Sequence, residues 1–316
     1  MSKLKTESRK VPQVQPKDEL VLLRNHVTVV IPTLNEANSI GILIDAVRSH
    51  GYDNILVVDG FSTDKTKMIA EERNVPVVMQ EGEGKSGALL TAFRSVKTEY
   101  TLLMDGNGSY DPSDLDKFLT YPESHNFVKG SRIRNENMPL LNRFGNYIVT
   151  STFNMLFGTS IGDVCSGMYL LKTEKVASLT LEKNSITAEQ EIAEQMAIAT
   201  DKLASVPINY GRRIGGKKKK NRLRQGFRYL VTDFKLAKEY NPLLLFSFFF
   251  TLALIPAVVL LISGLLLALF HSSQSGYFIT SAILFVLGVQ GVAIASVSGM
   301  FRKIERRLDS LSKSID

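Results

Sequence analysis

The chain has 316 residues, which suggests two structural units at about 150 residues per domain. Charged residues make up 22% and hydrophobic residues 44%, a mixture that excludes a largely disordered chain. The single cysteine, Cys165, excludes an internal disulfide and fits a reducing compartment. Nine basic residues and one acidic residue lie within 217–238 and give this segment a charge of +8, whereas the rest of the chain sums to about −1. The basic character therefore belongs to one short segment and does not indicate a nucleic-acid-binding face.

Alternating strand-like and helix-like segments follow a polar N-terminal tail, residues 1–26. Short β-branched apolar runs predict strands, and apolar residues at helical spacing predict helices between them. The expected strands are 27–31, 55–58, 75–79, 101–104 and one that starts at 127. The expected helices are 35–50, one capped by Ser62 or Thr63 and running to Ala70, and one after Gly84. This alternation predicts an α/β domain with a mostly parallel sheet between helices over residues 27–220.

Polar clusters follow three of these strands, at residues 32–36, 59–64 and 105–112. In parallel sheets ligands bind beyond the carboxyl ends of the strands. A single acidic residue there usually caps the next helix, as Asp64 can. Three clusters at three strand ends predict a common polar binding site.

The motifs in these clusters resemble those of family 2 glycosyltransferases with the GT-A fold. The segments that carry the resemblance are Pro32-Thr33-Leu34-Asn35-Glu36, Val57-Val58-Asp59, the loop Asp105-Gly106-Asn107-Gly108-Ser109, Gly84-Lys85, Gly130-Ser131-Arg132, Asp163-Val164-Cys165-Ser166-Gly167, Val206-Pro207-Ile208 and Arg213 with Gly216 and Lys219. With two C-terminal apolar spans, the chain is similar to dolichyl- or polyprenyl-phosphate sugar synthases. The resemblance implies a GT-A Rossmann-like domain, a nucleotide-diphospho-sugar donor and a divalent cation.

To bind the donor, such a site must bind the nucleotide base and neutralise the negative charge of the diphosphate. Asp59 can accept hydrogen bonds from a base N–H. The expected wall around base and ribose consists of Pro32, Leu34 and Glu36. Asp105, Asn107 and Ser109 carry oxygen donors two residues apart, which suits Mg²⁺ or Mn²⁺ acting as a Lewis acid on the leaving diphosphate. By resemblance, Lys85 and Gly106 also belong to the substrate site.

Further charged residues are predicted to act on the phosphates and the acceptor. Arg132, Arg213 and Lys219 would place positive charge on the phosphates. A surface ion pair is the alternative for Arg132, and attraction to lipid headgroups is the alternative for Lys219. Asp163 is predicted to lie near the acceptor, with a bond to loop amides as its alternative, and Glu189 or Glu191 to contact sugar hydroxyls. The predicted catalytic set is Asp105, Asn107, Arg132 and Asp163, and Glu191 is assigned to the substrate-binding set.

The C-terminal part is predicted to enter a membrane. Residues 243–270 and 276–301 contain no Asp, Glu, Lys or Arg, and each run is longer than the roughly 20 residues that span a bilayer core. A basic interfacial helix (221–241) precedes two transmembrane helices (242–301), and an amphipathic tail (302–316), which can also pair with another subunit, follows them. Basic residues flank the pair of spans on one side, which predicts a cytoplasmic catalytic domain and cytoplasmic termini. The alternative is a buried hairpin of a soluble protein.

The resulting hypothesis is an inverting hexosyltransferase that moves a sugar from GDP-mannose, UDP-glucose or a related donor to dolichyl or polyprenyl phosphate. Direct attack by the lipid phosphate on the anomeric carbon would invert its configuration. Three departures from the family pattern, at Gly60, Asn107 and Tyr169, keep a non-catalytic nucleotide-sugar-binding scaffold as an alternative. Transfer to a different lipid acceptor is a second alternative. A processive synthase is disfavoured because two spans are few for an export channel.

Overall fold

The computed structural model describes residues 17–121, 125–134, 139–176, 179–182, 185, 187–199, 202–214, 231, 234, 242–268 and 275–312. It divides into two compact units, Met1–Ser151 with Thr159–Tyr229 and Thr152–Gly158 with Leu230–Asp316.

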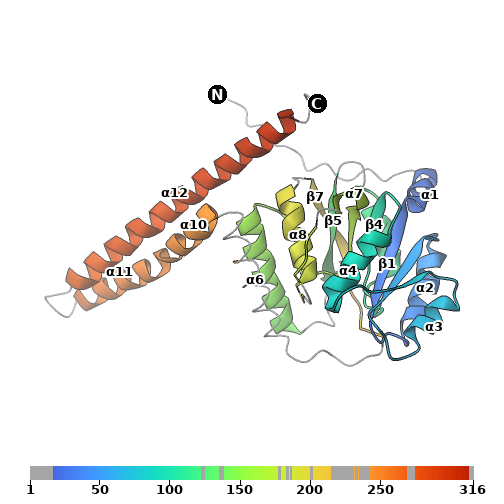
Figure 1. The fold of residues 1–316 in the computed structure, drawn as a ribbon. Helices are drawn as coiled ribbons and strands as arrows, with labels where there is room; N and C mark the ends of the chain where they lie inside the picture. The colour runs from blue at the N-terminus through green and yellow to red at the C-terminus, as the bar shows by residue number, and fades with distance from the viewer. Residues whose placement is uncertain are drawn as a thin grey trace. The chain divides into compact units, whose positions relative to one another are not determined.

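The first unit is built on one seven-stranded sheet (Figure 1). Its strands are β1 (Val27–Thr33), β2 (Ile55–Asp59), β3 (Val77–Met79), β4 (Tyr100–Leu103), β5 (Phe127–Arg134), β6 (Tyr169–Lys172) and β7 (Leu203–Asn209), in the order β3-β2-β1-β4-β6-β5-β7. All pairings are parallel except those of β6, which runs antiparallel to β4 and β5. The predicted mostly parallel sheet is therefore confirmed, with one reversed strand that the alternating pattern did not predict.

Parallel register brings the polar strand ends together. Strands β2 and β4 are buried throughout and β1 almost throughout, which is why they read as unbroken apolar runs in the sequence. Thr33 pairs with Asp59 across β1 and β2, and Val30 pairs with Leu103 at the end of β4. The carboxyl ends of β1, β2 and β4 thus lie next to one another, as the sequence predicts.

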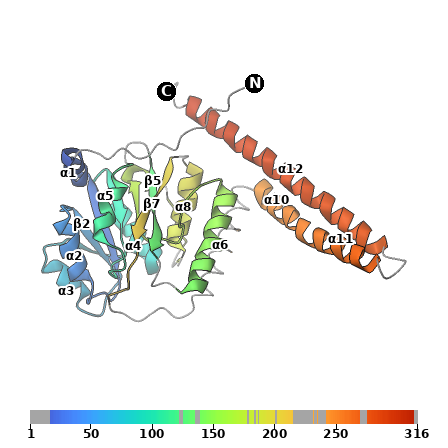
Figure 2. The ribbon, with the colours of Figure 1, turned by 180° about the vertical axis from the view of Figure 1, so that it is seen from behind.

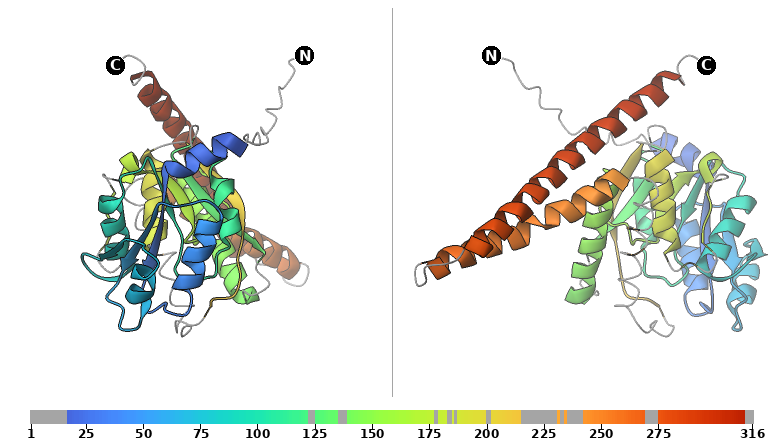
Figure 3. Two further views of the ribbon diagram at one scale, coloured as in Figure 1. Left: turned by 90° about the vertical axis from the view of Figure 1, so that its right-hand side faces the viewer. Right: turned by 60° about the vertical axis from the view of Figure 1, so that its left-hand side comes forward.

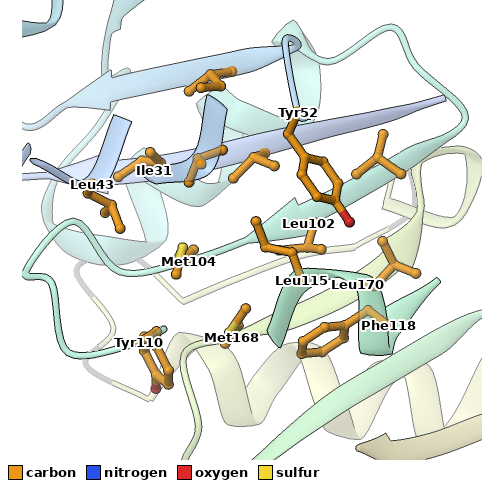
Figure 4. Packing of buried hydrophobic residues seen from close by; sticks show 14 of the residues in the cluster. Ile31, Leu43, Tyr52, Leu102, Met104, Tyr110, Leu115, Phe118, Met168 and Leu170 are labelled. Atoms are coloured by element: carbon orange, nitrogen blue, oxygen red, sulfur yellow. The ribbon is translucent and has the colours of Figure 1, made fainter. Parts of the chain in front are cut away.

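Helices lie on both sides of this sheet (Figure 2). They are α1 (Lys17–Asn25), α2 (Ile40–Ser49), α3 (Thr66–Glu71), α4 (Gly84–Ser95), a 3₁₀ turn (Pro112–Asp114), α5 (Leu115–Phe118), α6 (Leu140–Phe157), α7 (Thr173–Val176) and α8 (Ala188–Ala199). The end of α6, from Thr152, belongs to the second unit. The apolar face of α2 and alternate residues of β1 belong to one buried cluster that continues to β4 and β6. Ile31, Leu43, Leu102, Met168 and Leu170 show this packing in Figure 4.

Two helices begin later than the sequence predicts. Asn35 has φ 58°, a left-handed conformation that a right-handed helix cannot include, and α2 begins at Ile40 and not at residue 35. Ser62 and Thr63, the predicted caps of the next helix, bond to Asp59 and Asn35 instead, and α3 begins at Thr66. The residues released from the helices form the loops at the polar strand ends.

Helix α1 lies within the segment that the sequence assigns to a polar tail. Leu20 and Leu23 pack against the buried cluster, and Arg24 forms an ion pair with Asp116 at 2.6 Å. The folded unit therefore includes residues before Val27. The two leucines at helical spacing are the signal that the composition of the tail concealed.

The second unit contains three apolar helices, α10 (Pro242–Leu252), α11 (Leu254–Ala268) and α12 (Ser275–Ser312). Two segments are long and apolar enough to cross a membrane, Phe249–Ala268 with mean hydropathy 2.6 and Gly276–Ile294 with 2.0. Pro256 has no N–H to donate to Leu252, which accounts for the break between α10 and α11. The predicted boundary between span and tail at residue 301 falls inside the continuous helix α12. The predicted interfacial helix, 221–241, lies outside the described residues except for 231 and 234.

Small residues allow α12 to lie close against α10 and α11, and Figure 3 shows the helices side by side. A Cβ at Gly288 would lie 2.3 Å from the Leu254 side chain, and one at Gly291 would lie 2.6 Å from the Thr251 nitrogen. Ser281 donates to the Ala257 carbonyl at 2.8 Å. Close approach of small residues is the common way in which apolar helices associate in lipid.

We expect Gly291→Leu to separate the hairpin and destabilise it by about 1–3 kcal/mol, because its new side chain would meet backbone atoms that cannot move aside. Gly276→Leu is the matched control, since a Cβ there meets nothing within 4 Å. Thermal unfolding in detergent micelles measures both. Equal effects of the two substitutions would contradict the packing described here.

Candidate functional site

The loops after β1 and β2 are bonded to one another around Asp59. The Asp59 carboxylate is 1% exposed and accepts hydrogen bonds from the Ser62 N–H at 2.8 Å, the Ser62 hydroxyl at 2.6 Å and the Thr33 hydroxyl at 3.2 Å. Asn35 accepts from the Thr63 N–H at 2.8 Å and so ties the two loops together. Asp59 therefore fixes the shape of the loop, and its contact with a base stays a prediction.

The other residues of the predicted base and ribose wall surround the end of β1. Pro32 lies within β1, and Leu34 is 57% exposed just beyond it. Glu36 is buried and accepts a hydrogen bond from the Arg213 guanidinium, which comes from the segment after β7. The structure thus brings two predicted substrate residues, Glu36 and Arg213, into one ion pair. Arg213 Nε is buried and has no hydrogen-bond partner among the described residues.

The loop after β4 packs tightly on β1. A Cβ on Gly106 would lie 2.8 Å from Thr33 Cγ2, so only glycine fits at this crossing. The Asn107 side-chain oxygen accepts from the Ser109 N–H at 2.9 Å and from its hydroxyl at 2.5 Å. The Asn107 and Ser109 side chains therefore bond to each other, and Asp105 bonds to Lys85.

Asp105 and Glu189 hold Lys85 between them. Lys85 Nζ lies 2.7 Å from Asp105 Oδ1 and also pairs with the Glu189 carboxylate. Burial opposes the charge on Lys85, but the two carboxylates outweigh it and hold the Lys85 pKa well above its ordinary value. Gly167 lies against this cluster, and a Cβ there would come within 2.9 Å of the Asp105 carboxylate oxygens. The start of α4, the end of β4 and the start of α8 therefore meet at one charged cluster.

Glu191 has a different environment from Glu189. Its carboxylate accepts hydrogen bonds from the Glu182 N–H at 2.9 Å and the Thr187 hydroxyl at 3.0 Å, and from the Ser185 hydroxyl. These contacts hold the segment that precedes α8. Of the two glutamates that the sequence offers as sugar ligands, Glu189 is the one beside Asp105 and Lys85.

Arg132 and Asp163 form a buried bidentate pair. Arg132 Nε donates to Asp163 Oδ2 at 2.5 Å and Nη2 donates to Oδ1 at 3.0 Å, and the side chains are 8% and 9% exposed. Burial opposes the charge on Arg132, but Asp163 outweighs it and raises the Arg132 pKa above its ordinary value. Asp163 Oδ1 also accepts from the Cys165 N–H at 3.1 Å. Asp163 thus does bond a loop amide, and the ion pair of Arg132 is internal and not a surface one.

Lys129 is a buried cation that the sequence analysis did not single out. It is fully buried on β5 directly opposite Tyr169 on β6, and its Nζ lies 4.4 Å from the centre of the Tyr169 ring. Nζ also donates to the Glu189 carbonyl at 3.4 Å. Desolvation by burial lowers the Lys129 pKa to about 8. A lysine directly after the apolar pair Phe127-Val128 was the available signal.

Lys129→Met should stabilise the first unit at pH 7 by roughly 3 kcal/mol, because the charged amine is costly to bury. The folded-state pKa, about 8, lies below the ordinary 10.5, so between these values the unfolded chain binds more protons. Wild-type stability should therefore rise relative to the variant as pH increases from 8 to 10.5. Urea denaturation at pH 7 and at pH 10 measures the difference in unfolding free energy between the wild type and Lys129→Met, with exposed Lys67→Met as control. A difference that does not become smaller at pH 10 would refute the lowered pKa of Lys129.

Among the described residues, no group of three or more His, Cys, Asp or Glu side chains could hold a metal ion. The predicted ligand set of Asp105, Asn107 and Ser109 contains one carboxylate, so a cation held there would also need the phosphates of a donor. Oxygen-only donors fit a hard divalent cation such as Mg²⁺ or Mn²⁺. Lys219, the remaining predicted phosphate ligand, lies outside the described residues.

Comparison with known proteins decides the family. The model of glycosyl transferase family 2 matches residues 28–179. Glycosyltransferase AglJ of Haloferax volcanii is 34% identical over 70% of this chain and 75% of its own. The chain belongs to glycosyl transferase family 2. Dolichyl-phosphate hexose transferase of the same organism is 31% identical over 59% of this chain and 83% of its own. This family 2 chain is also 23% identical to UDP-N-acetylglucosamine–dolichyl-phosphate N-acetylglucosaminyltransferase of Methanococcus voltae, over 72% of this chain and 94% of that one.

Solved structures agree on the fold of this family 2 domain. Glucosyl-3-phosphoglycerate synthase of Mycobacterium tuberculosis, in complex with Mn²⁺, uridine diphosphate and phosphoglyceric acid, superposes with a TM-score of 0.56 at 20% identity. The match covers 70% of this chain and 84% of that one. The GT-A fold expected from the motifs is therefore confirmed. Membership of the family makes the chain a glycosyltransferase, and the scaffold alternative is not supported.

Proposed function

We propose that this glycosyltransferase moves a hexose from a nucleotide-diphospho-sugar to a polyprenyl or dolichyl phosphate at the cytoplasmic face of a membrane. The observation that carries the proposal is the charged cluster at the end of β4, Lys85 with Asp105 and Glu189, in a chain that also has two helices apolar enough to span a bilayer. Two relatives whose names specify dolichyl phosphate support the acceptor class.

The residues suit transfer to an acceptor that is already anionic. A lipid phosphate is ionised near neutral pH, so it needs alignment and charge balance more than a strong general base. Arg213 and Lys85 supply positive charge for the diphosphate, and Asp105 is the proposed carboxylate ligand of a divalent cation. The cation, when bound, would stabilise the departing diphosphate. In-line attack by the lipid phosphate would invert the anomeric carbon.

The test is a transfer assay with the full chain in lipid bilayers. Radiolabelled UDP- and GDP-hexoses are offered in turn with polyprenyl phosphate and Mg²⁺ or Mn²⁺, and organic extraction separates lipid-linked sugar from donor. We expect a labelled lipid product of inverted anomeric configuration with one donor class. Absence of product with every donor, or transfer to lipids without phosphate, would overturn the proposal.

Helix α6 presents an apolar surface that fits a lipid-borne acceptor. Leu140, Phe144 and Tyr147 are 78%, 61% and 69% exposed, and Arg143 is the one charged residue of the helix. Large exposed apolar patches mark interaction sites, and the two candidate spans make lipid the expected partner.

We expect Phe144→Glu to reduce transfer to long-chain polyprenyl phosphate in bilayers by about tenfold, because the new carboxylate would have to be buried in lipid. Transfer to a short, water-soluble prenyl phosphate should change little. Ile42→Glu, at a residue that is 58% exposed on α2, is the matched control. Equal losses with both acceptors would argue against lipid contact at α6.

A further inference from the structure

Lys85 occupies the coordination space that a cation on Asp105 would use. Its Nζ lies 2.7 Å from Asp105 Oδ1 and pairs with Glu189 on the other side. The Lys85 and Asp105 side chains are 29% and 25% exposed, whereas that of Glu189 is 7% exposed. The lysine thus bridges a more accessible carboxylate and a buried one.

The carboxylates of Asp105 and Glu189 differ in their surroundings. Asp105 follows β4 and starts the loop that carries the other proposed oxygen ligands, Asn107 and Ser109. Glu189 is in the first turn of α8, and its carbonyl accepts from the buried Lys129. Glu189 is therefore fixed within the domain, while Asp105 is the more accessible of the two carboxylates.

An ammonium and a divalent cation compete for the same carboxylate. Two positive charges at contact distance repel each other strongly in a partly buried site. A lysine side chain has four rotatable carbon–carbon bonds and can move its charge without moving the backbone. A second carboxylate within reach then decides where the ammonium rests when Asp105 takes up the cation.

We propose that Glu189 is a positioning residue: it retains Lys85 when a divalent cation displaces the ammonium from Asp105, so that Lys85 and the cation occupy Asp105 alternately. This inference rests on the proposed function, because it assumes that Asp105 is a cation ligand. Held by Glu189, Lys85 stays beside the cation as a second positive charge for the donor diphosphate. Without Glu189, Lys85 has only Asp105 as a carboxylate partner among the contacts described here and competes more strongly with the cation.

The test is a double-mutant cycle on the binding of Mn²⁺ alone, measured by calorimetry and by the electron paramagnetic resonance signal of free Mn²⁺, with the full chain in nanodiscs. We expect Lys85→Met to tighten Mn²⁺ binding by about tenfold and Glu189→Gln to weaken it by about tenfold. In the Lys85→Met background, Glu189→Gln should have little effect, because no competing ammonium remains. Lys67→Met and Glu71→Gln remove an exposed pair on α3 and should leave Mn²⁺ affinity unchanged.

The double-mutant cycle distinguishes a Glu189 that positions Lys85 from a Glu189 that only attracts the cation. If Glu189 only attracts the cation, Glu189→Gln weakens Mn²⁺ binding by the same factor in both backgrounds, and the proposal fails. Failure of Lys85→Met to tighten binding, including absence of any Mn²⁺ binding in that variant, also overturns it. The unfolding temperature of each variant verifies that it is folded. The binding assay contains neither the nucleotide-sugar donor nor the polyprenyl phosphate acceptor. Non-coupled substitutions in an enzyme that still transfers sugar would therefore refute this inference alone. Coupled substitutions in a protein that transfers no sugar would refute the proposed function alone.

Discussion

Asp163→Asn should destabilise the glycosyltransferase domain by about 3–5 kcal/mol, because it leaves the guanidinium of Arg132 buried without its anionic partner. Both side chains are less than one-tenth exposed and are joined by two hydrogen bonds. The asparagine would keep one acceptor oxygen but could not balance the charge. This loss is a large fraction of the total stability of an ordinary domain.

Urea denaturation of the full chain, followed by circular dichroism, measures the effect. Glu81→Gln is the control, because its pair with Arg94 at 2.6 Å has side chains that are 69% and 68% exposed, and such pairs contribute only about 0–1 kcal/mol. Replacing both members, Arg132→Met with Asp163→Leu, should recover much of the stability lost by Asp163→Asn while abolishing transfer. Similar losses from Asp163→Asn and Glu81→Gln would show that the pair is not buried in solution.

The polar ends of the strands could be predicted because the residues that determine them are neighbours in the sequence. Apolar runs such as 27–31 and 55–58 can bury both faces only in a covered sheet, and polar residues directly after them must lie at its edge. The strands β2, β4 and β1, which Asp59, Asp105 and Glu36 end or follow, therefore lie side by side for a reason that a single sequence contains. The reversal of β6 depends on contacts with β4 and β5, which are distant in sequence, so no local pattern indicates it.

The ion-pair partner of a charged residue was harder to predict than the strand or helix in which the residue lies. Glu189 and Glu191 are two positions apart in one helix, and only the packing of α8 against the start of α4 shows that Glu189 meets Lys85. Helix period alone places two such residues on different faces, without saying which face the site is on. For Arg132 the sequence left a phosphate ligand and a surface ion pair open, and only the structure shows that Asp163, thirty-one residues away, is bonded to it.

Asp105→Asn is expected to weaken cation-dependent donor binding by more than about a hundredfold, since it removes the carboxylate that we propose as the ligand of the divalent cation. The amide is nearly isosteric, so the tight packing of Gly167 against residue 105 should be kept. Lys85 would retain Glu189 as its anionic partner, which should limit the loss of stability.

Calorimetric titration of UDP and GDP, each with Mn²⁺ and with chelator, measures the change. Asp111→Asn is the matched control, because Asp111 lies further along the same segment and accepts from the Ser113 N–H at 2.9 Å. It should leave cation-dependent binding intact, because its carboxylate caps the 3₁₀ turn. If Asp105→Asn binds nucleotide with the wild-type dependence on Mn²⁺, the cation is held elsewhere, and the charged cluster of Lys85, Asp105 and Glu189 must act on the sugar or the acceptor instead.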